Sequence, residues 1–220
     1  MPPLPFFGRY HGVMKPVSKR PASIERYHAV GGVLDIRIFE EAEGNEDEIL
    51  DAIGQTLGVA DYRPEALRGI GGRRTDEAGM FGSWFDPATG RLVSPRRRPL
   101  RDGRMPTDVP IVTLTDAEFG RMGASVAEPG TGGELAYAFT YPPYGLHAPP
   151  MEIQSLFDAL RHAILPRHHR SFIIDWTSPR LPEVSAAYFE PGMEWWGVFL
   201  FSIHIPETQH LTIIAGSATD

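Results

Sequence analysis

The chain has 220 residues, of which 42% are hydrophobic, so it is long enough to bury one large core. It contains no cysteine, which excludes disulfide bonds, thiolate metal ligands and a cysteine nucleophile, and is typical of a reducing compartment. Its net charge of −7 disfavours a nucleic-acid partner, and no apolar run approaches the roughly 18 residues that span a membrane. We therefore expect a cytoplasmic protein with no nucleic-acid or membrane partner.

Acidic and basic residues are separated along the first half of the chain. Residues 38–66 carry nine acidic side chains against Arg63, whereas residues 67–104 carry nine arginines against four acidic side chains. The simpler interpretation is that the two blocks neutralise each other across the fold. The alternative is that the arginines form a patch for an anionic ligand.

The proline distribution predicts an arm and one domain. Residues 1–24 contain five prolines and little periodicity, which favours an extended arm. Residues 25–220 are expected to form a single domain, with a possible subdomain break in the arginine- and proline-rich stretch at 95–106.

The first strand and helix follow this arm. Alternating apolar residues predict a strand over residues 32–40. Asn45 followed by Glu48 has the form of a capping box, and Gly58 is a suitable terminator, so a helix is predicted over 46–57.

The middle of the chain predicts shorter elements. In chain order these are a helix over 61–68, a hairpin pairing 81–85 with 91–93, a strand over 109–114, a short helix opened by the capping box at Thr115, and a strand over 135–141.

The C-terminal third carries the most apolar segments. A helix over 151–165 has one apolar face and is stopped by Pro166. Three β-branched and aromatic runs predict strands at 171–177, 195–205 and 209–215, the last two forming a hairpin. The mixture lacks regular βαβ alternation, so we expect an α+β fold. A mixed, largely antiparallel sheet would be built on these strands and packed by helices 46–57 and 151–165.

A catalytic site is one hypothesis for the ends of these strands. The segment His210-Leu-Thr resembles one copy of the His-x-Thr motif of two-histidine phosphoesterases, in which one imidazole acts as base and the other as acid. The expected second copy is missing, since the other His-x-Ser/Thr match, at His169, lies about forty residues earlier. A hydrolase or phosphoesterase site would use His204 or His210 with Asp175 or Glu194.

A second histidine cluster, formed by His162, His168 and His169, lies around the end of the 151–165 helix. Its spacing matches no zinc motif, and basic residues are favourable at a helix C-terminus in any case. We therefore predict no metal site and no cofactor.

Aromatic residues are the candidates for a binding surface. Adjacent tryptophans in a strand point to opposite faces, so at most one of Trp195 and Trp196 would lie in the central core. Exposed aromatic side chains beside an acidic residue are typical of protein-binding hot spots. The candidate binding residues are Trp176, Trp195, Trp196, Tyr144 and Tyr188.

One segment resembles a binding protein. Residues 47–69 resemble the helix–loop–helix of barstar-like ribonuclease inhibitors, over about a tenth of the chain. The resemblance implies an inhibitor-type partner protein, although the family's Tyr-Gly-x-Asn and Trp-Asp motifs are absent and no family is assigned.

The expected function is a non-enzymatic cytoplasmic protein-interaction module, of inhibitor or immunity type. The alternatives are the hydrolase described above and a small-molecule sensor with tryptophans lining an apolar pocket.

Overall fold

The computed structural model describes residues 13–94, 108–120 and 129–218. Within these residues, six strands form one sheet in which every pairing is antiparallel. The strand order across the sheet is β1 (Lys15–Pro16), β2 (Asp35–Glu40), β9 (His210–Ser217), β8 (Val198–Ile205), β7 (Phe172–Asp175) and β3 (Arg73–Thr75). This α+β architecture confirms the predicted fold class, and all three predicted C-terminal strands are neighbours at its centre.

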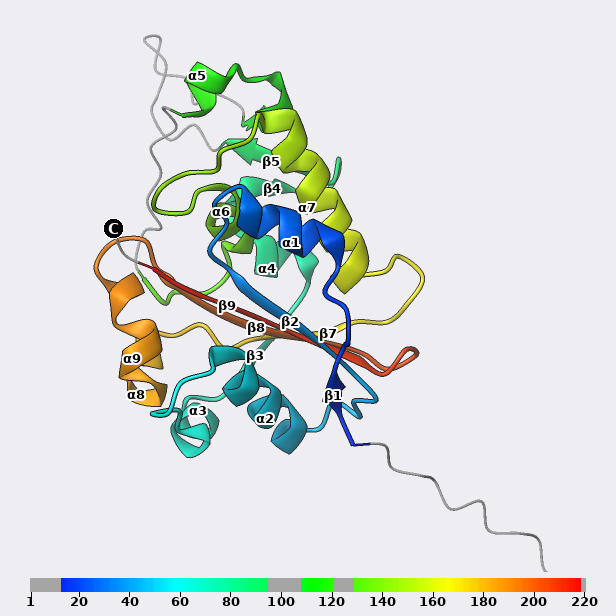
Figure 1. Ribbon diagram of the computed structural model, residues 1–220, viewed down its shortest axis with the longest axis vertical. Helices are drawn as coiled ribbons and strands as arrows, with labels where there is room; N and C mark the ends of the chain where they lie inside the picture. The colour runs from blue at the N-terminus through cyan, green and yellow to red at the C-terminus, as the bar shows by residue number, and fades with distance from the viewer. Residues whose placement is uncertain (1–12, 95–107, 121–128, 219–220) are drawn as a thin grey trace, which may run out of the picture.

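Helices cover both faces of this sheet (Figure 1). One face carries α2 (Glu46–Leu57), α3 (Pro64–Ile70), α8 (Leu181–Val184) and α9 (Ala186–Phe189). The other carries α1 (Ala22–Ala29), α4 (Glu77–Phe81), α6 (Leu135–Thr140) and α7 (Pro150–Ile164). The central strands are therefore covered on both sides.

The two faces of β8 enter two different cores. Phe199 and Phe201 pack in the core beneath α6 and α7, whereas Val198 and Leu200 pack in the core beneath α2 and α8. Every residue of β8 is buried. Because successive side chains of a strand alternate between faces, a strand covered on both sides is expected to be mainly apolar. This explains why six of the eight residues of β8 are apolar, the exceptions being Ser202 and His204.

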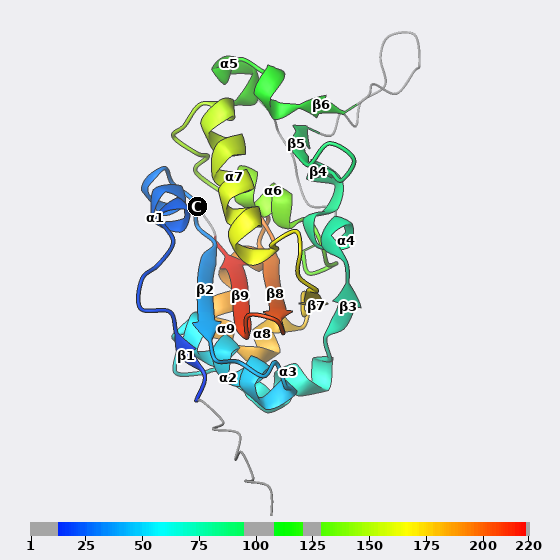
Figure 2. The same ribbon diagram turned by 90° about the vertical axis from the view of Figure 1, so that its right-hand side faces the viewer.

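A smaller three-stranded sheet lies beside α7, away from the large sheet (Figure 2). It consists of β4 (Phe85–Asp86), β5 (Arg91–Ser94) and β6 (Val109–Pro110). A 3₁₀ turn at Gly82–Trp84 precedes it, another at Ile111–Thr113 follows it, and the short helix α5 (Asp116–Phe119) comes next. A third 3₁₀ turn, Pro191–Met193, lies before β8.

The two long predicted helices form where their caps and apolar faces placed them, whereas the helix predicted over 61–68 spans Pro64–Ile70. The Asn45 side chain accepts a hydrogen bond from the Glu48 amide at 3.0 Å, and α2 ends at Gly58 with φ 64°. The Glu48 carboxylate reaches the amide of Gly44 at 2.8 Å, one residue before the cap. α7 begins and ends one residue before the predicted bounds, because Pro150 fits the first helical turn.

Three predicted strands are wrong in part or entirely. Residues 135–140 form the helix α6, in which every residue is buried. Ala136 and Ala138 separate the large side chains, so the apparent alternation is one of size and not of polarity, and it fits a helix buried all round. The strand predicted at 109–114 stops at Pro110, after which the chain makes a 3₁₀ turn. The predicted strand at 81–85 likewise begins only at Phe85.

The strand predicted at 195–205 is shorter than predicted and leaves out the tryptophan pair. β8 begins at Val198, and Trp195 and Trp196 lie in the turn before it. Strand alternation therefore does not apply to them, yet their burial differs: Trp196 is fully buried and Trp195 is 39% exposed.

The described part of the predicted arm contacts the body of the protein. β1 pairs with β2, and α1 begins at Ala22. Residues 1–12 and the predicted break at 95–106 lie outside the described residues. Among the helices that the structure describes, none has the length and apolar character needed to cross a bilayer.

Candidate functional site

The four predicted catalytic residues lie on different parts of the sheet. His204 pairs with Leu211 and His210 pairs with Ile205, so these adjacent cross-strand pairs place the two imidazoles on opposite faces. His204 is 9% exposed, and its Nε2 lies 3.2 Å from the carbonyl oxygen of Ala42. Asp175 pairs with Phe201, three residues along β8 from His204, or about 10 Å at the rise of a strand.

Glu194 lies farther away still. It precedes β8, whereas His204 is six residues beyond the start of that strand, a separation of about 20 Å along the strand direction. The structure therefore does not bring the imidazoles and carboxylates of this hypothesis into one site.

Asp175 occupies a structural position at the end of β7. One carboxylate oxygen accepts the Thr177 amide at 2.9 Å, and the other accepts the Gly133 amide at 3.1 Å and the Arg73 guanidinium at 3.0 Å. The carboxylate side chain is 2% exposed and that of Arg73 is 68% exposed. These bonds hold the loop before α6 against the edge of the sheet.

The second histidine cluster does not converge. His162, His168 and His169 are all exposed, and no group of three or more metal-ligating side chains occurs among the residues that the structure describes. His162 lines a groove along α7.

Three of the five predicted aromatic binding residues have structural partners. The Trp176 indole is buried and donates to Ser202 Oγ at 2.9 Å. The Tyr188 hydroxyl donates to Asp35 at 2.6 Å, and burial together with that carboxylate raises the pKa of Tyr188 well above its ordinary value. Trp196 is fully buried and packs edge-on against Phe199. Tyr144 and Trp195 are the two that reach solvent, at 70% and 39% exposure.

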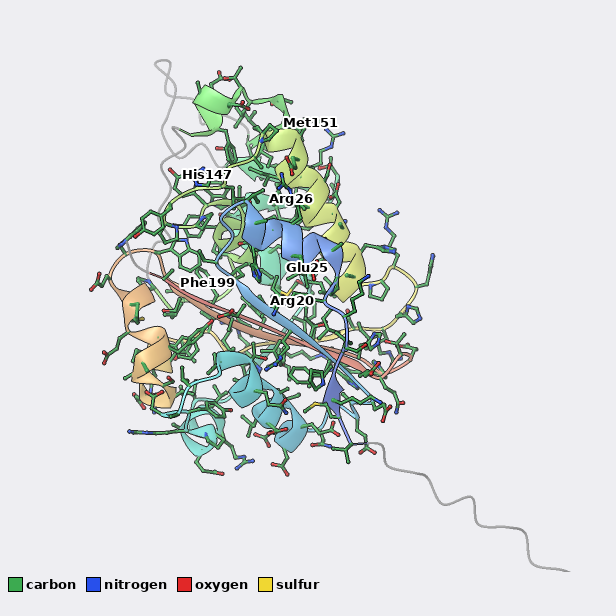
Figure 3. The ribbon with its side chains drawn as sticks, in the orientation of Figure 1. Arg20, Glu25, Arg26, His147, Met151 and Phe199 are labelled. Carbon is green, nitrogen blue, oxygen red and sulfur yellow. The ribbon has the colours of Figure 1, made fainter. Side chains whose placement is uncertain are left out.

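Tyr144 projects from a short loop, residues 141–147, that we call the Tyr144 loop. Its first carbonyl, on Tyr141, accepts the Trp196 indole N–H at 2.8 Å. Within the loop the Gly145 amide donates to the carbonyl of Pro142 at 2.9 Å, closing a turn. The amide of His147 donates to the carbonyl of Val30 at 2.7 Å, so the loop ends beside α1 (Figure 3).

These bonds fix the loop at both ends and in the middle. Two prolines, Pro142 and Pro143, restrict it further because each ring fixes one backbone dihedral. The Tyr144 side chain is thus an exposed aromatic group on a restrained backbone. It makes no hydrogen bond or ring contact among the described residues.

A pocket of about 350 Å³ lies against this loop. Tyr141 and Tyr144 line it, together with Phe119, Leu146 and Thr140. The Tyr141 ring packs against Trp84 with a centroid distance of 6.1 Å, which ties the pocket to the core. Thr140 is fully buried and its Oγ1 has no hydrogen-bond partner among the described residues. A buried polar atom without a partner is costly to the fold.

Trp195 lies at the same end of the sheet as the Tyr144 loop. The bond from its neighbour Trp196 to Tyr141 joins the turn before β8 directly to the Tyr144 loop. The exposed carboxylates of Glu190 and Glu194 lie on that turn segment. The candidate site is therefore an aromatic surface with acidic side chains beside it, in a chain of net charge −7.

Sequence reasoning identified Tyr144 and Trp195 but missed the residues that make the pocket. Phe119 and Thr140 line the pocket from two different helices, α5 and α6. Nothing in the local sequence of either helix predicts that these two residues lie close together. The Tyr-Pro-Pro-Tyr-Gly sequence was the usable signal, since it marks a rigid turn bearing aromatic side chains. No protein-family model, curated protein or solved structure matches this chain.

Proposed function

We propose that this chain is a cytoplasmic protein-interaction module that binds a basic partner protein, in the manner of an inhibitor or immunity-type protein. The observation that carries the proposal is the exposed Tyr144 side chain on a backbone held by three hydrogen bonds, beside a pocket with an unpaired buried hydroxyl.

The restrained loop supports binding without a large entropic cost. A flexible aromatic loop has to be ordered on binding, at a cost of about 0.5–1.5 kcal/mol for each immobilised side chain. The Tyr144 backbone is already fixed, so less of the contact energy is lost. Tyrosine and tryptophan are also the side chains most enriched at binding hot spots, and the site exposes one of each.

The pocket and the charges indicate the chemistry of the partner. A volume of about 350 Å³ between Tyr141, Tyr144 and Leu146 suits one apolar side chain of a partner loop. The exposed carboxylates of Glu190 and Glu194, and the net charge of −7, favour a partner surface that carries lysine and arginine.

The test is site-specific photo-crosslinking in native cells. A photoreactive phenylalanine replaces Tyr144 in one variant, Trp195 in a second, and Val13 in a control. Val13 is 84% exposed and lies two residues before β1, the edge strand of the large sheet. We expect positions 144 and 195 to trap the same basic protein and position 13 to trap none of it.

The purified partner then provides an affinity measurement. Tyr144→Ala is expected to weaken binding about 30-fold, the effect of a hot spot of about 2 kcal/mol, whereas Val13→Ala leaves the affinity unchanged. The proposal is wrong if the two positions trap different proteins, if the shared protein is acidic, or if Tyr144→Ala binds as tightly as the parent protein.

A further inference from the structure

A second hollow, which we call the α7 groove, runs along α7 opposite the β4–β5 hairpin. It has a volume of about 710 Å³ and is continuous with a neighbouring hollow of about 500 Å³, since both are lined by Arg161 and Arg167. Its volume is within the range of small-molecule sites, about 300–1,000 Å³. No residue of the Tyr144 loop lines it.

One end of the groove is cationic. Arg161 is fixed in place, because its Nε bonds to the Glu77 carboxylate and its guanidinium lies 5.2 Å from the centroid of the Phe85 ring. A Cβ at Gly90, in the hairpin turn, would lie only 2.9 Å from Arg161 Nη1, so glycine permits the close approach of that turn. Arg91 and Arg167 also line the groove.

Those two arginines are exposed, and neither makes an ion pair within the described part of the chain. The contrast is Arg68, which pairs with Asp47 at 2.7 Å and Glu65 at 2.6 Å. The acidic block at 38–66 therefore neutralises Arg68 of the basic block at 67–104, but it does not neutralise Arg91. A guanidinium pair facing a hollow is a common arrangement for binding phosphate or carboxylate groups.

The middle of the groove holds an oriented carboxylate. Gln154 is 7% exposed; its Oε1 accepts the Leu92 amide at 2.9 Å, and its Nε2 donates to Asp158 at 2.8 Å. Both ends of the amide are thus engaged, which fixes the Asp158 side chain toward the groove that it lines. A carboxylate held this way accepts hydrogen bonds from hydroxyl or amino groups of a ligand.

The other end of the groove is apolar. Met151, 63% exposed at the N-terminal end of α7 (Figure 3), and Val112 line it there. Met151 and Arg161 are ten residues apart on α7, which is about 15 Å along the helix axis. Along the axis of α7, the groove therefore presents first an apolar surface, then a hydrogen-bond acceptor and then a cationic group.

We propose that the α7 groove binds a nucleoside phosphate. Its phosphates would contact Arg91, Arg161 and Arg167, its ribose hydroxyls would donate to Asp158, and its base would pack on Met151 and Val112. This ligand class carries anionic, hydroxyl-bearing and flat apolar parts in the order in which the groove presents their complements.

The test is isothermal titration of the full chain with ADP, GDP and UDP, and with adenosine and pyrophosphate as part-ligands. We expect at least one of the three diphosphates to bind. Arg91→Gln and Arg167→Gln should each weaken that binding about tenfold or more, since each removes a charge-assisted contact to phosphate. Both residues are exposed, so the variants should fold, and far-UV circular dichroism verifies this.

Arg20→Gln is the matched control, because Arg20 is an exposed arginine that lines neither hollow (Figure 3). It should leave the affinity within about twofold of the parent value. Adenosine and pyrophosphate should each bind more weakly than the diphosphate. The proposal is overturned if none of the three diphosphates binds up to about 1 mM, if either part-ligand binds as tightly as the diphosphate, or if the arginine variants behave like the control.

Discussion

The adjacent tryptophans in the turn before β8 allow one packing argument to be tested with an internal control. Trp196 is fully buried and donates its indole N–H to the carbonyl of Tyr141, whereas Trp195 is 39% exposed. We predict that Trp196→Phe destabilises the fold strongly and that Trp195→Phe, the same chemical change one residue earlier, does not.

The magnitude follows from two losses. The hydrogen bond to Tyr141 disappears, leaving a partly buried carbonyl without its donor, which costs about 1–2 kcal/mol. The smaller ring also leaves a void of about 40 Å³, worth about 1 kcal/mol at 24 cal/mol per Å³. We therefore expect Trp196→Phe to lower the free energy of unfolding by about 2–3 kcal/mol, and Trp195→Phe by less than about 0.5 kcal/mol.

Urea denaturation followed by far-UV circular dichroism measures both values, and it is preferable to tryptophan fluorescence because the substitutions change that signal. With a slope of about 2–3 kcal/mol per M, the Trp196→Phe midpoint should fall by about 1 M while the Trp195→Phe midpoint stays in place. Equal midpoints for the two variants, or a larger loss for Trp195→Phe, would refute the burial and hydrogen bonding assigned to this turn.

Two further predictions concern buried ionisable groups. Asp175→Ala should lower the free energy of unfolding by about 2–5 kcal/mol, because two backbone amides lose their acceptor. Arg73→Gln should lower it by only about 1 kcal/mol, because the Arg73 side chain is 68% exposed. Chemical denaturation measures both values, and a larger loss for Arg73→Gln would contradict this assignment. Burial raises the pKa of Tyr137 to about 12, and burial with the Asp35 carboxylate raises that of Tyr188 well above its ordinary value. The unfolded chain releases these protons near pH 10 while the folded chain keeps them, so stability falls as the pH rises above 10. In an ultraviolet pH titration these tyrosines should ionise together with unfolding, and ionisation of every tyrosine near pH 10 in a folded protein would contradict the prediction.

The sequence predicted well those elements whose signals are local. The cap at Asn45 and the glycine at 58 set the bounds of α2 because both act on the helix ends themselves. The β-branched and aromatic run at 195–205 predicted a strand, and β8 forms within it at Val198–Ile205. α6 was missed because six buried residues, five of them apolar, fit a buried helix as well as a strand, and only the packing around them decides between the two.

The candidate sites were harder to predict, because burial of the sheet changes what its polar residues do. His204 and Asp175 looked like catalytic groups at strand ends, but a sheet covered on both faces has little solvent-facing surface there, and each is engaged in hydrogen bonding to the backbone. The candidate sites lie instead on the loops and helix surfaces that pack against the sheet. The Tyr144 loop shows this dependence, since one of the three hydrogen bonds that restrain it comes from Trp196, which the sequence suggested as a binding residue.

The same reasoning separates the two proposed sites from each other. The Tyr144 loop is held by the large sheet through Trp196, whereas the α7 groove is held by the small sheet through the bond from Leu92 to Gln154. A substitution that loosens one of these anchors should therefore leave the other site intact. Trp196→Phe should lower the affinity for the basic partner protein and leave the affinity for the nucleoside phosphate unchanged. Gln154→Ala should lower the affinity for the nucleoside phosphate and leave the affinity for the partner protein unchanged. Parallel loss of both affinities in either variant, measured where both variants are folded, would mean that the two surfaces form one coupled unit.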